Sequence, residues 1–271
     1  ANGWKTLYSN TSGDLNTAVG YNALNSNTSG DENNAFGTGS LEANTTGIRN
    51  NAFGRDAQWA NVDGDYNVAY GDNALRLNVS GNSNVAIGAK AMFRTKNVSN
   101  LVAIGDSALY NNASGTITGD QGHYNTAIGS KSLYTNTIGY YNTAVGYHSL
   151  YSNSDGIGNS ALGYNSQSST TTGDKNSSFG VNSLAENTTG GQNTAMGFEA
   201  LNNNITAPNN TSIGYQSMYT NESGEDNTAL GKSSLYKNVS GDDNVAIGRN
   251  ALYNSTGNNN VALGASTGTG L

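Results

Sequence analysis

The residues of this chain best suited to acid–base or metal chemistry are two histidines and a series of carboxylates. His123 and His148 are not accompanied by an Asp or Glu pair at metal-ligand spacing. The carboxylates gather at one recurring corner, at Asp14, Asp31, Glu32, Asp65, Asp174, Glu225, Asp226, Asp242 and Asp243. Calcium could bind at such corners, but the RTX nonapeptide pattern is absent, so we favour solvated turns. The chain also lacks Cys. We expect no enzyme activity, no catalytic residue, no metal and no cofactor.

Aromatic side chains that recur at a fixed spacing are the second candidate, and their chemistry would be contact with sugar rings or with another surface. They are Tyr8, Trp59, Phe93, Tyr110, Tyr134, Tyr151, Tyr219, Tyr236 and Tyr253. Packing of these rings on one another, between repeats or across chains, is the alternative that we favour. The residues that we name as receptor-binding candidates are Trp59, Tyr110, Ile117, His123, Tyr124, Tyr134 and Tyr151.

A repeat of 17 residues positions all of these side chains. We number it from the opening Asn of Asn16-Thr17-Ala18-Val19-Gly20, so that the glycine is position 5. A short fixed period predicts a solenoid, in which each repeat forms one rung that stacks on the next. The position-5 glycines are Gly20, Gly37, Gly54, Gly71, Gly88, Gly105, Gly129, Gly146, Gly163, Gly180, Gly197, Gly214, Gly231, Gly248 and Gly264.

Positions 2 to 4, for example Val85-Ala86-Ile87, are rich in β-branched residues and bounded by turn formers, which predicts a short β-strand. Position 4 is always large and apolar, and we expect it to point into the core. Position 3 is always Ala or Ser, which predicts a face with close packing. Positions 8 to 10, often Ala-Leu-Tyr, could form a second strand or one helical turn. The predicted core residues are Val19, Ile87, Ile104, Ile128, Val145, Ile213 and Ile247.

Asparagine and glycine mark the remaining fixed positions of the rung. Asn opens almost every rung and recurs at position 12, where stacked side chains can bond to one another and to backbone groups at the corners. Gly recurs at positions 5 and 15, which predicts corners with positive φ. The Asn side chains of position 1 that we expect to form a structural ladder include Asn16, Asn33, Asn50, Asn67, Asn84, Asn125 and Asn142.

The predicted fold is therefore an all-β, parallel β-solenoid of about fifteen rungs that occupies residues 1–271 as a single domain. A seven-residue insertion near 116–124 interrupts the repeat and predicts a protruding loop. One stack would leave a long Ala-lined face to cover. We therefore expect a homo-oligomer, namely a parallel homotrimer in which three chains bury that face around a common axis.

Charge and hydropathy argue against two classes of partner, nucleic acids and membranes. The net charge is −7 and the twelve Lys and Arg are scattered, so no basic stripe predicts nucleic-acid binding. No apolar run approaches the roughly 20 residues of a membrane span, so we expect no membrane insertion in this segment.

Asn84-Val85-Ala86-Ile87-Gly88, and the equivalent segments at 125–129 and 244–248, resemble the head repeat of YadA-like trimeric autotransporter adhesins. The fuller pattern at 142–153 is similar to repeat arrays of phage and viral tail fibres and of bacterial surface proteins. The resemblance covers essentially the whole chain. It implies a left-handed parallel β-roll, trimerisation and a role in attachment to a host or surface.

We accordingly expect a structural and adhesive fibre segment, extracellular, on a cell surface or a virion fibre. Its partners would be copies of itself and a surface glycan or host receptor. An ice-binding β-solenoid is the first alternative, for which the Thr residues of position 2 are mixed with Asn, Val and Ser. A polysaccharide-degrading spike is the second.

Overall fold

The computed structural model describes residues 1–115 and 118–269, in two compact units, Ala1–Tyr140 and Tyr141–Leu271. The described residues form fifteen parallel strands of three residues, one to a rung, and no helix. The prediction of an all-β, parallel β-solenoid is confirmed. The single domain and the trimer stay predictions, and Ile117 lies outside the described residues.

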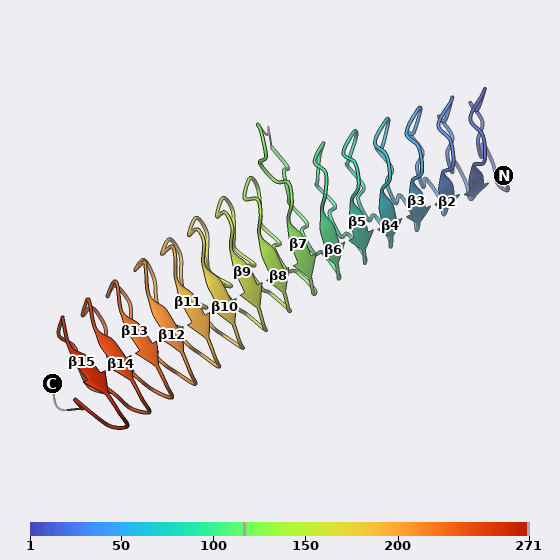
Figure 1. The fold of residues 1–271 in the computed structure, drawn as a ribbon. Helices are drawn as coiled ribbons and strands as arrows, with labels where there is room; N and C mark the ends of the chain where they lie inside the picture. Colours follow the sequence, from blue (N-terminus) through green and yellow to red (C-terminus); the bar gives the residue numbers. More distant parts are fainter. Residues whose placement is uncertain (116–117, 270–271) are drawn as a thin grey trace. The chain divides into compact units, whose positions relative to one another are not determined.

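In the first unit the strands lie side by side in chain order (Figure 1). Each strand residue pairs with its equivalent in the next rung. This register holds from β6 to β7, although the rung between them is longer, as in the pairing of Ile104 with Ile128. The insertion is therefore accommodated outside the sheet. The strands are β1 (Thr17–Val19), β2 (Asn34–Phe36), β3 (Asn51–Phe53), β4 (Val68–Tyr70), β5 (Val85–Ile87), β6 (Val102–Ile104) and β7 (Thr126–Ile128).

The second unit repeats this arrangement with eight strands in chain order. Its rungs are drawn from green to red in Figure 1. The strands are β8 (Thr143–Val145), β9 (Ser160–Leu162), β10 (Ser177–Phe179), β11 (Thr194–Met196), β12 (Thr211–Ile213), β13 (Thr228–Leu230), β14 (Val245–Ile247) and β15 (Val261–Leu263).

The core is built from small residues of the strands, and the prediction that position 4 forms it is wrong. In β5, Ala86 is fully buried, whereas Val85 is half-buried and Ile87 is 39% exposed. Side chains alternate along a strand, so only the middle residue of three points inward. None of the predicted core residues is buried: Val19, Ile87, Ile104, Ile128, Val145, Ile213 and Ile247 all lie on the outer side.

Position 9 supplies the large core side chains. Leu75, Leu109 and Met92 are fully buried in the first unit. In the second unit Leu184, Leu201, Met218, Leu235 and Leu252 form one cluster with the buried alanines. A file of large residues on one wall of a narrow coil leaves room only for small residues on the other, which explains the Ala of position 3.

Positions 6 to 10 form tight turns and are neither a second strand nor a helical turn. Position 7 and position 9 adopt left-handed φ, as in Asn73 (58°) and Leu75 (50°). The N–H of Asn73 donates to Arg55 in the rung before, at 2.8 Å, and the N–H of Leu75 donates to Ala91 in the rung after, at 2.9 Å. Because these N–H groups bond alternately to the two neighbouring rungs, the segment satisfies its backbone without regular secondary structure.

Glycine recurs at positions 5 and 15 for two different structural reasons. Position 5 has positive φ, as predicted: Gly71 lies at φ 140°. The position-15 glycines of the 17-residue rungs, such as Gly47 and Gly64, do not, so this part of the prediction is wrong for them; Gly122, which ends the longer rung, has φ 76°. A Cβ at Gly47 would lie 2.5 Å from Oδ1 of Asn44 and 2.6 Å from the carbonyl oxygen of Gly64. Glycine is required there because the side-chain oxygen of the position-12 Asn and the carbonyl oxygen of the next rung both approach the backbone closely.

Candidate binding surfaces

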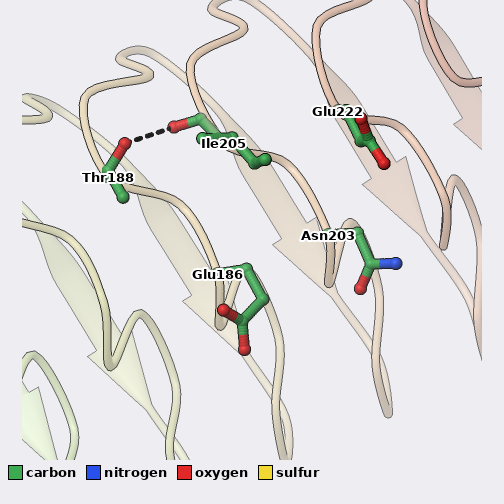
Figure 2. Close-up of a pocket in the computed structure, with 5 residues that line it drawn as sticks. All are labelled: Glu186, Thr188, Asn203, Ile205 and Glu222. Carbon is green, nitrogen blue, oxygen red and sulfur yellow. Dashed lines mark hydrogen bonds between the residues drawn. The ribbon is translucent and has the colours of Figure 1, made fainter.

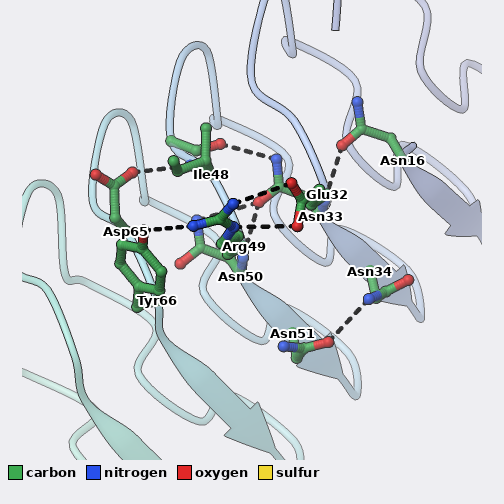
Figure 3. Close-up of polar contacts among 11 residues, drawn as sticks. Asn16, Glu32, Asn33, Asn34, Ile48, Arg49, Asn50, Asn51, Asp65 and Tyr66 are labelled. Carbon is green, nitrogen blue, oxygen red and sulfur yellow. Dashed lines mark hydrogen bonds and ion pairs between the residues drawn. The ribbon is translucent and has the colours of Figure 1, made fainter. Parts of the chain in front are cut away.

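The predicted ladder at position 1 is confirmed as a structural element (Figure 3). The side-chain oxygens of Asn16, Asn33, Asn50 and Asn67 each accept the N–H of the next Asn, at 2.9 to 3.0 Å. Asn84 accepts the N–H of Leu101 at 3.1 Å, and Asn125 donates to Gly139 at 2.8 Å. In the second unit Asn142 accepts the N–H of Asn159 at 2.9 Å.

The predicted bonds from the Asn side chains to backbone groups at the corners are confirmed, and they close a rung on itself. The carbonyl oxygen of Gly64, at position 15, accepts the amide of Asn50 at 2.7 Å and that of Asn61 at 2.9 Å. The two Asn columns therefore meet on one carbonyl. These two Asn residues lie 14 and 3 residues before the glycine in the sequence. The shorter spacing indicates such a bond, because an Asn side chain can reach the backbone a few residues further along the chain.

The carboxylates at position 16 cap the backbone of the preceding rung. Asp65 accepts the N–H of Ile48 at 2.8 Å (Figure 3), and Asp174 accepts that of Ile157 at 2.7 Å. Within 1–115 and 118–269, no group of three or more Asp, Glu or His side chains is placed to hold a metal. These side chains of the corner are therefore hydrogen-bond acceptors, not only solvated charges.

The histidine of the insertion has the same capping role. Nδ1 of His123 accepts the N–H of Ser99 at 3.2 Å, and the amide of Asn112 reaches the carbonyl of Gly122 at 2.8 Å. Gly122, His123 and Tyr124 thus hold positions 15 to 17 of a regular rung. The extra residues are 115–121, and the assignment of His123 and Tyr124 to a protruding loop is wrong.

The outer face of the sheet, formed by positions 2 and 4, carries a file of large apolar side chains in each unit. Phe36 stacks on Phe53 at 4.7 Å, and Phe53 on Tyr70 at 4.5 Å between ring centroids. In the second unit Phe179 is 49% exposed and Leu230 is 44% exposed. The apolar side chains therefore form a file through consecutive rungs that stays exposed to solvent in the single chain, whereas soluble monomers rarely expose large continuous apolar patches.

The aromatic side chains at position 10 form a second file, and their faces cover one another. Phe93, Tyr110 and Tyr134 stack at 5.2 and 5.1 Å in the first unit. Tyr219, Tyr236 and Tyr253 stack at 5.4 and 5.0 Å in the second unit, where burial raises the pKa of Tyr236. The alternative of packing between rungs is confirmed, and stacking of sugars on these faces is unsupported because the faces are occupied.

The predicted receptor-binding residues are not gathered into one site. Tyr110 and Tyr134 are in direct contact, and Trp59 lies in the same file, with Arg76 4.7 Å above its ring. Tyr124 is 43% exposed beside His123. Tyr151 belongs to the second unit, where it lies against His148.

Two shallow hollows, which the sequence did not predict, lie along the same part of the repeat, at positions 11 and 13 in one and positions 10 to 14 in the other. The acidic hollow, of about 300 Å³, is lined by Glu186, Thr188, Asn203, Ile205 and Glu222 (Figure 2). The basic hollow, of about 310 Å³, lies in the first unit and is lined by Leu77, Phe93, Arg94, Lys96 and Ser114. Both volumes are at the lower end of the range for ligand sites.

No family model, curated protein or solved structure matches this chain. Among the residues that the structure describes, no helix is able to cross a membrane.

Proposed function

We propose that this chain is a structural and adhesive fibre segment that assembles as a parallel homotrimer and mediates attachment to a host or surface. Its place would be extracellular, on a cell surface or a virion fibre. Its partners would be two further copies of itself and a surface glycan or host receptor. The observation that carries the proposal is the apolar file on the outer face.

The outer face supports self-assembly because it is both apolar and repetitive. Position 4 presents Val, Ile, Leu, Met, Phe or Tyr in every rung, and these side chains stay half-exposed in the single chain. The expectation of an Ala-lined face is corrected here, since the alanines are the interior. Covering each such side chain removes apolar area from water at about 25 cal/mol per Å².

A parallel arrangement follows from the regularity of the file. Copies that lie side by side in the same direction bring equal rungs to equal heights, so that each side chain meets its equivalents around an axis. Three is the number implied by the resemblance to trimeric adhesins, and closed rotational symmetry keeps the assembly finite.

The absence of Cys allows a sharp test of this geometry. The variant Ile104→Cys should form disulfide-linked pairs of chains on mild oxidation, whereas Lys175→Cys, at a corner of the second unit, should not. Mixed assemblies of Ile104→Cys and Ile213→Cys chains should form no 104–213 pair. Failure of Ile104→Cys to link, or the appearance of 104–213 pairs, would contradict the parallel trimer. Retention of the labelled chain on an array of surface glycans tests attachment separately.

Ice binding is a second candidate, favoured by one observation. In the second unit position 2 presents a hydroxyl in six consecutive rungs, and all six side chains are exposed or half-buried: Thr143, Ser160, Ser177, Thr194, Thr211 and Thr228. Ice would need this face open, whereas the trimer covers it. If the chain is a monomer in solution and its solution shows thermal hysteresis, the fibre proposal is wrong and ice binding takes its place.

A further inference from the structure

We infer that the basic hollow binds an acidic saccharide, that is, a sugar bearing a carboxylate or sulfate group. The inference rests on the proposed attachment function and names its ligand class and site. Four observations lead to it: the cavity, its unpaired cations, the local excess of positive charge, and the break in the repeat at this point.

The two cations of the hollow have no counterpart within the chain. Arg94 and Lys96 are exposed, and their side chains make no hydrogen bond or ion pair with any described residue. This differs from Arg49 and Arg55, which bond to carboxylates at 3.0 and 2.8 Å. A guanidinium and an ammonium side by side without an anion are suited to a carboxylate or sulfate ligand.

The surroundings of the hollow reverse the charge of the whole chain. Residues 73–105, between Asp72 and Asp106, contain Arg76, Lys90, Arg94 and Lys96 and no Asp or Glu, although the net charge of the protein is −7. Of these four cations, Arg76 is paired with Asp56 at 3.8 Å. The equivalent hollow of the second unit carries Glu186 and Glu222 instead. The positive character therefore belongs to this site and not to the repeat.

The repeat is broken where the hollow lies. Thr95, between the two cations, replaces the Asn of position 12. It is fully buried, and its Oγ1 has no hydrogen-bond partner among the described residues. Val98 replaces the Gly of position 15, and Leu101 the Asn of position 1. Because buried polar groups are almost always paired, these substitutions cost stability, and a function at this rung would explain why the sequence carries them.

The remaining walls suit a sugar. Leu77 and the ring edge of Phe93 offer apolar contact to C–H groups, since the face of Phe93 is stacked on Tyr110. Ser114 offers a hydroxyl to the ring oxygens and hydroxyls of a saccharide. A small number of polar groups beside an apolar wall is typical of small-ligand sites.

A nucleic acid fits the same site less well. Its phosphates lie at every nucleotide and need a continuous basic stripe. Two cations on an acidic body can neutralise one or two charges, which matches a sugar with one acidic group on an otherwise neutral ring.

The test is calorimetric titration of the full chain with trigalacturonic acid and with a sulfated galactose trisaccharide. The methyl ester of trigalacturonic acid serves as the neutral analogue. We expect binding of at least one acidic probe, little or no binding of the ester, and a loss of about tenfold or more in affinity for the double variant Arg94→Gln/Lys96→Gln. The matched control is Lys5→Gln/Lys131→Gln, which removes the same charge from the first unit outside the hollow and outside residues 73–105.

Three results would overturn the inference: equal binding of the neutral ester, an equal loss of affinity in both double variants, or no binding of either acidic probe. A single-stranded oligonucleotide of twelve deoxythymidines, bound more tightly than the sugars and lost in Arg94→Gln/Lys96→Gln, would assign the hollow to nucleic acid and also overturn it.

The inference and the proposed function can fail separately. If chains link through Ile104→Cys and the glycan array retains the protein equally with and without Arg94 and Lys96, attachment stands and the basic hollow is not its site. If the acidic probes bind but no chains link, the hollow stands and the trimer does not.

Discussion

The side-chain oxygen of Asn33 accepts the backbone N–H of Asn50 at 3.0 Å, one rung further along the chain. Both side chains are fully buried, and each amide also donates to the position-15 carbonyl of its own rung. One residue type thus performs two tasks, holding rung to rung and closing each rung. The solenoid is therefore held by a buried polar column as well as by its thin apolar core.

Removal of one ladder side chain should be costly. Asn50→Ala leaves the N–H of Asn67 without its acceptor and takes one of two donors from the carbonyl of Gly64. Because an unsatisfied buried group costs about 1–3 kcal/mol, we expect a loss of about 2–3 kcal/mol in the free energy of unfolding, measured by chemical denaturation. Asn25→Ala, at a half-exposed site, is the control and should cost below about 1 kcal/mol. Equal effects of the two would refute the ladder's role.

Enlargement of the inner strand residue should destabilise the fold more than a change to its outer neighbour. Ala86 is fully buried, so Ala86→Leu must displace the packed wall and should cost about 1–3 kcal/mol. Ile87→Leu, one residue on, keeps its volume on the outer face and should cost less than about 1.5 kcal/mol. Thermal or chemical unfolding of both variants measures this. A tolerated Ala86→Leu would mean that the strand faces are reversed.

The overall repeat, its strands and its Asn ladder could be predicted because period and residue type fix them. Which side chains of each strand point into the core could not be predicted. Ile87 was assigned to the core because large apolar residues are usually buried. In a coil this narrow, Met92 and its equivalents fill the interior, so Ala86 is the residue that fits. The basic hollow escaped prediction because it arises from side chains of neighbouring rungs.

Backbone strain offers a stabilising substitution. Lys131 lies at position 7 with φ 56°, a region that costs an ordinary L-residue about 1–2 kcal/mol and that Asn tolerates better. Lys131→Asn should therefore raise the free energy of unfolding by about 0.5–1 kcal/mol. The same change at Lys96, where φ is not positive, should give no gain. A destabilised Lys131→Asn chain would show that the lysine side chain has a role of its own.

Acid should weaken one surface ion pair in a defined pH range. The side chain of Arg55, 2.8 Å away, lowers the pKa of Asp72 below its ordinary value of about 3.8. Its contribution is therefore present above pH of about 3.8 and is lost as the pH falls through the lowered value. Because both side chains are solvent-exposed, Asp72→Asn should cost less than about 1 kcal/mol at pH 7.

The measurement for Asp72 is the free energy of unfolding of wild type and Asp72→Asn between pH 6 and pH 2. The two curves should converge towards the acid end. A difference that is constant over this range would contradict the assignment of the pKa shift to the ion pair.

The proposal that copies of the chain cover the outer apolar face is tested most directly by the mass of the protein in solution, measured by multi-angle light scattering at micromolar concentration. One chain has a mass of 28.0 kDa, so a homotrimer has about 84 kDa (3 × 28.0). We predict the latter value, and a shift towards a single chain for Ile104→Asp, which places a charge on that face. A mass of 28.0 kDa for the folded wild-type chain would contradict the proposal.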